Sequence, residues 1–213
     1  MSLIKLNYSK RTNKALFNIA SSFVIKGASI LLSLLLVPIT LDYLNPYEYG
    51  IWLTLSSVLM WINYFDIGLG NGLRNKLSEA LAVGDDNLAR IYVSTSFFIL
   101  FLIALSIFFI FLLSKDWIDW GAFLNIPHKL GEVVSHMMTF VVLCVTIAFS
   151  LKIVTYVYFA KQMPLINNLI NLLSQLFSFI FIYVLTAYCD TNKLQWVAYI
   201  YSCLLYTSDA ADD

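Results

Sequence analysis

The run LARIYVSTSFFILFLIALSIFFIFLL, residues 88–113, decides the class of this protein. From Ile91 to Leu113 it contains no charged residue. A helix needs roughly 20 predominantly apolar residues to cross the hydrocarbon core of a bilayer, and this run has that length. It does not show the strict alternation of apolar and polar residues that is typical of a transmembrane β-strand. The run therefore predicts a membrane-spanning α-helix.

Similar apolar runs recur along the 213-residue chain, which is 60% hydrophobic and only 12% charged. Soluble domains carry about 25% charged residues, so the composition argues against an ordinary soluble protein. We expect an all-α polytopic membrane protein whose main partner is the lipid bilayer. The predicted spans cover, within a few residues, 16–41, 47–65, 88–113, 133–160 and 164–188, and a sixth begins at 194 and is cut off at 202.

The last eleven residues, CLLYTSDAADD (Cys203–Asp213), break this pattern. They resemble, residue by residue, the translation of a transposase sequencing adapter. We expect residues 1–202 to form one transmembrane domain and residues 203–213 to be a non-native tail on a truncated reading frame. Three of the 13 acidic residues, Asp209, Asp212 and Asp213, fall in that tail, so the 13 Lys and Arg residues leave the remainder with a formal charge of 13 − 10 = +3.

Lysine and arginine are unevenly distributed among the connectors. Cytoplasmic connectors of membrane proteins carry an excess of these residues. The segments on the N-terminal side of the membrane hold eight, namely Lys5, Lys10, Arg11, Lys14, Arg74, Lys76, Arg90 and Lys161, and the opposite side holds three, Lys115, Lys129 and Lys193. We therefore expect a cytoplasmic N-terminus.

Cysteine and histidine give no sign of a metal centre. The chain has three cysteines, Cys144, Cys189 and Cys203, and two histidines, His128 and His136, none of them in a metal-ligand spacing. We expect no metal, no cofactor and no nucleic-acid partner.

The glycine-rich connector FDIGLGNGLRNKLSEALAVGDDNLAR, residues 65–90, stands out from its apolar surroundings. It lacks the Lys-Ser or Lys-Thr pair of a P-loop and follows a predicted span, where a dinucleotide fold would have a strand. Leucine instead recurs every fourth residue from Leu69 to Leu81, which predicts an amphipathic helix. We expect Gly84 to cap that helix and Asp85 or Asp86 to begin the next span.

Three further glycines, Gly68, Gly70 and Gly72, are expected to form a hinge or turn before that helix. Pro38 lies near the end of the first predicted span. It is equally expected to bend that helix or to help end it.

Four charged residues are candidates for substrate binding. Asp66, Arg74 and Lys76 would lie at the mouth of a cavity, where Arg and Lys bind phosphate oxygens; the alternative is a plain interfacial connector. Lys26 lies about ten residues into the first span, a depth at which a charge usually faces a cavity or a partner unless it snorkels to the headgroups. For Lys152, in the fourth span, we expect snorkelling. Basic residues inside the membrane favour an anionic substrate.

These segments resemble the polysaccharide flippases of the multidrug/oligosaccharidyl-lipid/polysaccharide exporter superfamily, which includes the Wzx-type O-antigen flippases and the MATE transporters. The resemblance lies in NIASSFVIKGASILLSLLLVPITLDYLNPYEYGIWLTLSS (residues 18–57) and in the connector 65–90. It implies two six-helix lobes around a central cavity, of which this chain is most of the first, so that the C-terminal lobe would be missing. It also implies a bacterial cytoplasmic membrane and transport of undecaprenyl-diphosphate-linked oligosaccharides by alternating access. Cationic cavity residues, here Lys26, Arg74 and Lys76, would then hold the diphosphate.

Two alternatives remain. A cation-coupled drug exporter of the same superfamily would be expected to place carboxylates deep in its spans, where this sequence has none. A polytopic enzyme of envelope synthesis would need a catalytic cluster at a membrane face, and His128 with Glu132 is the one such pair. We therefore expect a transporter that is not an enzyme.

Overall fold

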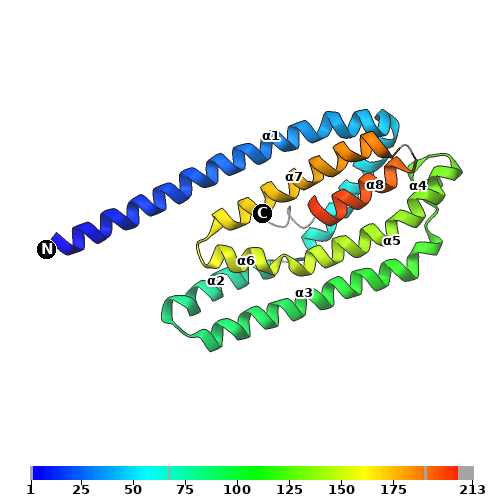
Figure 1. The fold of residues 1–213 in the computed structure, drawn as a ribbon. Coiled ribbons are helices and arrows are strands. Elements are labelled where there is room, and N and C mark those ends of the chain that lie inside the picture. Colours follow the sequence, from blue (N-terminus) through cyan, green and yellow to red (C-terminus); the bar gives the residue numbers. More distant parts are fainter. Residues whose placement is uncertain (1, 67, 190, 206–213) are drawn as a thin grey trace.

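The computed structural model of the chain describes residues 2–66, 68–189 and 191–205, and all of them form helices or the turns between helices. Residues 206–213, the greater part of the expected non-native tail, lie outside the described residues. Figure 1 shows long helices lying side by side. In chain order the helices are α1 (Ser2–Met60), η1 (Trp61–Asp66), α2 (Leu69–Val83), α3 (Asp86–Ser114), η2 (Lys115–Trp117), α4 (Trp120–Leu124), α5 (His128–Leu151), α6 (Ile153–Ala160), α7 (Pro164–Tyr188), α8 (Lys193–Ile200) and η3 (Tyr201–Leu205).

Four helical segments of the described chain are long and apolar enough to cross a membrane, namely Ser21–Asp66, Asp86–Trp117, Leu130–Ala160 and Pro164–Tyr188. The described residues confirm the prediction of an all-helical protein with several helices long and apolar enough to cross a membrane. The first of the four segments contains residues 21–41 of the first predicted span (16–41) and the whole of the second (47–65).

The first segment is divided at Asn45, whose backbone has a positive φ of 68°. The Asn45 side chain accepts hydrogen bonds from the backbone N–H groups of Tyr47, at 3.0 Å, and Glu48, at 3.1 Å. A side-chain oxygen that accepts from the second and third residues after it is the N-cap arrangement, so one residue ends the first leg of α1 and begins the second. In Figure 1 the chain reverses direction here.

The helix continues through Pro38 to this break, so the prediction that Pro38 helps to end the first span is wrong. Proline lacks one N–H donor, and loss of a single bond does not stop a helix that neighbouring helices support. Leu36 and Thr40, on either side of Pro38, are both buried. The packed neighbours thus hold α1 together across the proline.

The fourth predicted span consists of two helices, α5 and α6, with an interruption at Lys152. Lys152 keeps right-handed helical angles (φ −52°, ψ −25°), so the interruption is local. The next span begins with Pro164 in the first turn of α7, where its missing N–H leaves no helical hydrogen bond unmade.

Helix α5 forms the centre of the bundle. In the most apolar stretch of Leu130–Ala160, the segment that contains most of α5, 61% is buried inside the protein. The corresponding shares are 11% for the segment of α3 and 17% for α7. Val134, Met137 and Val141 of α5 are fully buried against Trp52 and Leu55 of the second leg of α1. The outer faces of α3 and α7 remain apolar and exposed, as helices in contact with lipid or with further protein require.

A second core lies where α2 packs against α3 and α6. Leu73 and Leu77 of α2 are buried there with Leu100, Phe149 and Tyr156. The leucine stripe predicted for residues 69–81 is thus the face that packs on the bundle. We call this region, with the neighbouring turn at residues 161–163, the α2 end; the reversal at Asn45 lies at the opposite end (Figure 1).

Candidate functional site

The turn into α2 is made by Gly68. Its φ of 78° is left-handed, a conformation that glycine adopts at no steric cost. Gly70 and Gly72 lie inside α2, so the prediction that they form the hinge or turn is wrong. The chain is helical here and not a turn because the Gly72 N–H donates to the Gly68 carbonyl oxygen, four residues earlier, at 2.9 Å.

Gly70 has a packing function. A Cβ atom at this position would collide with the ring of Tyr156 from α6. No comparable contact exists at Gly72, where a Cβ would meet open space. The glycine at position 70 therefore allows α2 and α6 to approach each other closely.

Asp66 joins the same contact. Its side chain is buried, with 7% exposed, and both carboxylate oxygens have partners. The Tyr156 hydroxyl donates to Oδ2 at 2.6 Å, and the backbone N–H of Gly70 donates to Oδ1 at 3.0 Å. The carboxylate thus binds the first turn of α2 and also links it to α6. Because both oxygens already accept hydrogen bonds from within the chain, Asp66 stabilises the position of α2 and does not offer an unoccupied carboxylate to a substrate.

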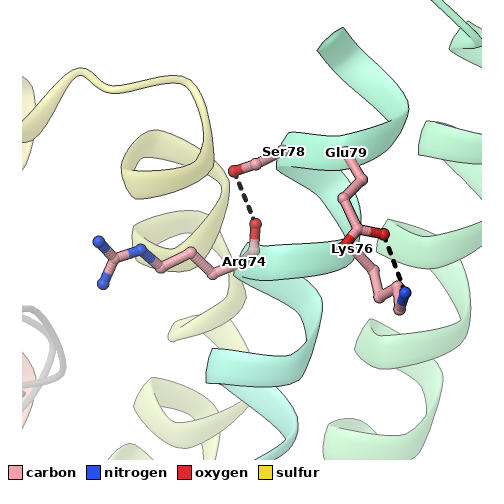
Figure 2. Close-up of polar contacts among 4 residues, drawn as sticks. All are labelled: Arg74, Lys76, Ser78 and Glu79. Atoms are coloured by element: carbon pink, nitrogen blue, oxygen red, sulfur yellow. Dashed lines mark hydrogen bonds and ion pairs between the residues drawn. The ribbon is translucent and has the colours of Figure 1, made fainter. Parts of the chain in front are cut away.

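Arg74 and Lys76 lie on opposite sides of α2 (Figure 2). The Arg74 guanidinium lies over the ring of Phe159, 5.3 Å from its centroid. The Lys76 ammonium donates to a carboxylate oxygen of Glu79 at 2.8 Å. This hydrogen bond and the charge of Glu79 raise the pKa of Lys76. The structure therefore does not bring these two candidates together into one binding site.

Helix α2 is tied to the end of α6 through Ser78. The Ser78 hydroxyl lies 2.8 Å from the carbonyl oxygen of Arg74 and 3.2 Å from that of Ala160. Gly84 ends α2 with a φ of 77°, and the Asp85 side chain then accepts from the backbone N–H of Leu88 at 2.9 Å to begin α3. These bonds fix the position of the basic residues on α2.

Lys26 is exposed on the first leg of α1, beside Phe23 and Val24, whose side chains are 74% and 73% exposed. The hydroxyl of Tyr43, 17 residues further along, donates to the Cys189 carbonyl oxygen just past α7. This contact places Tyr43 level with the end of α7. Lys26 lies 17 residues back from Tyr43, and Pro164 lies 25 residues back from Cys189. At 1.5 Å per residue, the difference places Lys26 about 12 Å along the bundle from the start of α7 at Pro164. It therefore lies within the apolar part of the helix.

Lys152 is placed differently from our expectation. Only 3% of its surface is exposed, so it does not snorkel, and that prediction is wrong. Its neighbours along α6 include buried polar residues: Thr155 donates to the side-chain oxygen of Asn167 on α7 at 3.3 Å. Helix α6 packs against α2 and α7, and Lys152, directly before α6, is covered within the protein. The cluster of Ser150, Lys152 and Thr155 near the end of one span was the sequence signal for a buried polar region.

These features define the class of the protein as an all-helical bundle with several helices long and apolar enough to cross a membrane, and with basic residues at one end of the bundle. Within the described residues, no group of three or more His, Cys, Asp and Glu side chains could hold a metal ion. The chain matches no protein-family model, and searches of the curated proteins and of the solved structures found no similar protein.

Proposed function

We propose that this chain forms the first lobe of a transporter that moves a lipid-linked oligosaccharide, carried on undecaprenyl diphosphate, across the bacterial cytoplasmic membrane. The N-terminus would be cytoplasmic, with five complete spans and the beginning of a sixth. The reversal at Asn45 supports this count, because it divides the first apolar segment into two legs.

The observation that carries the proposal is the exposed Lys26 in the apolar stretch of α1. A charge inside the apolar part of a span costs about 2.5–3.5 kcal/mol on insertion scales, so such a residue usually faces a water-filled cavity or a polar partner. A second lobe packed around a water-filled cavity would provide that surrounding. An ammonium group in such a cavity attracts a diphosphate.

Arg74 is the second residue that we assign to the substrate. Its guanidinium is exposed and makes no ion pair with a described residue, so it is free to bind a phosphate oxygen. Lys76 is a weaker candidate because Glu79 already neutralises it. Asp66 contributes by holding α2, and with it Arg74, in place. Transport requires no bond to be made or broken, only rocking of two lobes about the bound substrate.

The test is complementation of a flippase-null strain by the complete reading frame, scored by surface polysaccharide. We expect the wild-type gene to restore the polysaccharide and the variants Lys26→Ala and Arg74→Ala to lower it at equal protein level. Lys115→Ala, at the opposite end, is the matched control. A wild-type gene that fails to complement although it is expressed would refute the flippase proposal. Normal transport by both variants would refute the residue assignment alone.

A further inference from the structure

A groove of about 730 Å³ lies at the α2 end of the bundle, between α2, α3 and the last turn of α6. Two cations line it, Arg90 from α3 and Lys161 from the turn after α6. Both are exposed, and neither forms an ion pair with any described residue. We propose that this groove binds one anionic phospholipid of the surrounding bilayer, with its phosphate between Arg90 and Lys161. The site is separate from the cavity proposed for transport.

The arrangement along α3 matches an amphiphile. Asp86, Arg90, Ser94 and Phe97 recur every three or four residues and all line the groove, so they share one face of the helix. The charged and hydroxyl groups come first, and Phe97 lies about 10 Å beyond Arg90 at 1.5 Å per residue. Phe97 then stacks on Phe101, with ring centroids 6.3 Å apart. A headgroup at Arg90 would place its acyl chains along these two rings.

The apolar side of the groove continues into an exposed apolar surface of α3. Phe97 and Phe101 are 42% and 44% exposed and lie in the segment Asp86–Trp117, the most apolar of the four candidate spans. On the α2 side the groove is closed by Leu77 and Leu81. An occupant therefore needs a long apolar part that leaves the groove along α3, which a free phosphate ion lacks.

Charge selects among lipids. Asp86 is the third charged side chain in the lining, so Asp86, Arg90 and Lys161 sum to +1. A headgroup with a net negative charge is favoured over a zwitterion at such a site. Phosphatidylglycerol fits best, because its phosphate can accept from Arg90 and Lys161 while its glycerol hydroxyls donate to Asp86.

The test is native mass spectrometry of the purified chain in detergent, titrated with phosphatidylglycerol, with phosphatidylethanolamine of the same acyl chains, or with inorganic phosphate. We expect one phosphatidylglycerol to be retained with an affinity about tenfold above that for phosphatidylethanolamine, and no retained phosphate. Arg90→Gln and Lys161→Gln should each weaken phosphatidylglycerol binding about tenfold, the order expected for one charge-assisted hydrogen bond. Lys115→Gln, at the other end of α3, should bind as the wild type does.

Three outcomes would overturn the proposal. Equal affinity for the two lipids would remove the charge argument. Displacement of the lipid by inorganic phosphate would show a simple anion site. Identical binding by Arg90→Gln, Lys161→Gln and Lys115→Gln would show that the lipid lies elsewhere. The wild-type preference between lipids needs no variant, so it tests the proposal even if a variant folds poorly.

Discussion

The hydrogen bond between Tyr156 and Asp66 should be a main support of α2. It joins residues 90 positions apart, at 2.6 Å, and both side chains are buried. Tyr156→Phe removes the hydroxyl and leaves the ring in place. The Oδ2 atom of Asp66 then loses its donor where little water can replace it. Hydrogen bonds to charged groups contribute about 1.5–3 kcal/mol, so we expect a loss of that size in unfolding free energy.

Thermal unfolding in detergent, followed by tryptophan fluorescence, measures this loss. For a chain of about 200 residues, 1 kcal/mol corresponds to a shift of about 2–4 °C in Tm, so Tyr156→Phe should lower Tm by roughly 3–12 °C. The matched control is Tyr64→Phe, because the Tyr64 side chain is 82% exposed. Surface substitutions usually change stability by less than about 0.5 kcal/mol.

A double-mutant cycle assigns the effect to the pair. Asp66→Asn weakens the acceptor, and the Asn amide can still accept from the N–H of Gly70. If the Tyr156–Asp66 bond carries the energy, Tyr156→Phe should cost much less in the Asp66→Asn background than in the wild type. Equal Tm values for Tyr156→Phe and Tyr64→Phe, or strictly additive effects in the cycle, would refute the reasoning.

Three further predictions use the same unfolding measurement. Gly70→Ala should destabilise by about 1–3 kcal/mol because its methyl collides with Tyr156, whereas Gly72→Ala should stabilise by about 0.5–1 kcal/mol because it meets open space; the same sign for both would contradict the packing argument. Asn45→Ala should cost about 1–2 kcal/mol by removing two capping bonds, and Asn45→Gly should cost less because glycine adopts a φ of 68° without strain; an unchanged Tm for Asn45→Ala would show that the cap is unimportant. Gly84→Ala should cost about 1 kcal/mol because φ is 77°, and an unchanged Tm would show that the turn relaxes.

Local features of the fold could be predicted from the sequence because their causes are local. The leucine spacing from Leu69 to Leu81 gives α2 its buried face. Asp85 begins α3 by accepting a hydrogen bond from Leu88, three residues along the chain. Pro164 begins α7 at a position where its missing N–H has no helical partner to lose. In each case the residues that determine the structure lie within one or two helical turns of one another.

Contacts between distant helices could not be predicted in this way. Asp66 was expected at the mouth of a cavity, but Tyr156 lies 90 residues away and nothing in the local spacing points to it. The same reason applies to Gly70. The sequence predicted that it forms a hinge or turn, but glycine is needed there because the ring of Tyr156 from α6 leaves no room for a Cβ atom. Lys152 is covered by helices whose packing no local pattern specifies.

The basic residues near the α2 end therefore fall into groups that only the structure separates. Lys76 is bound to Glu79, and Lys152 is buried. Arg90 and Lys161 line a groove that continues into an apolar helix face, which suits a bilayer lipid. Arg74 projects from the opposite side of α2 to Lys76, over Phe159. If a transported diphosphate met every cation at this end, Arg90→Gln and Lys161→Gln would impair transport as strongly as Arg74→Ala. On the division argued from the structure, Arg74→Ala should impair transport most, and the other two should act mainly on lipid retention.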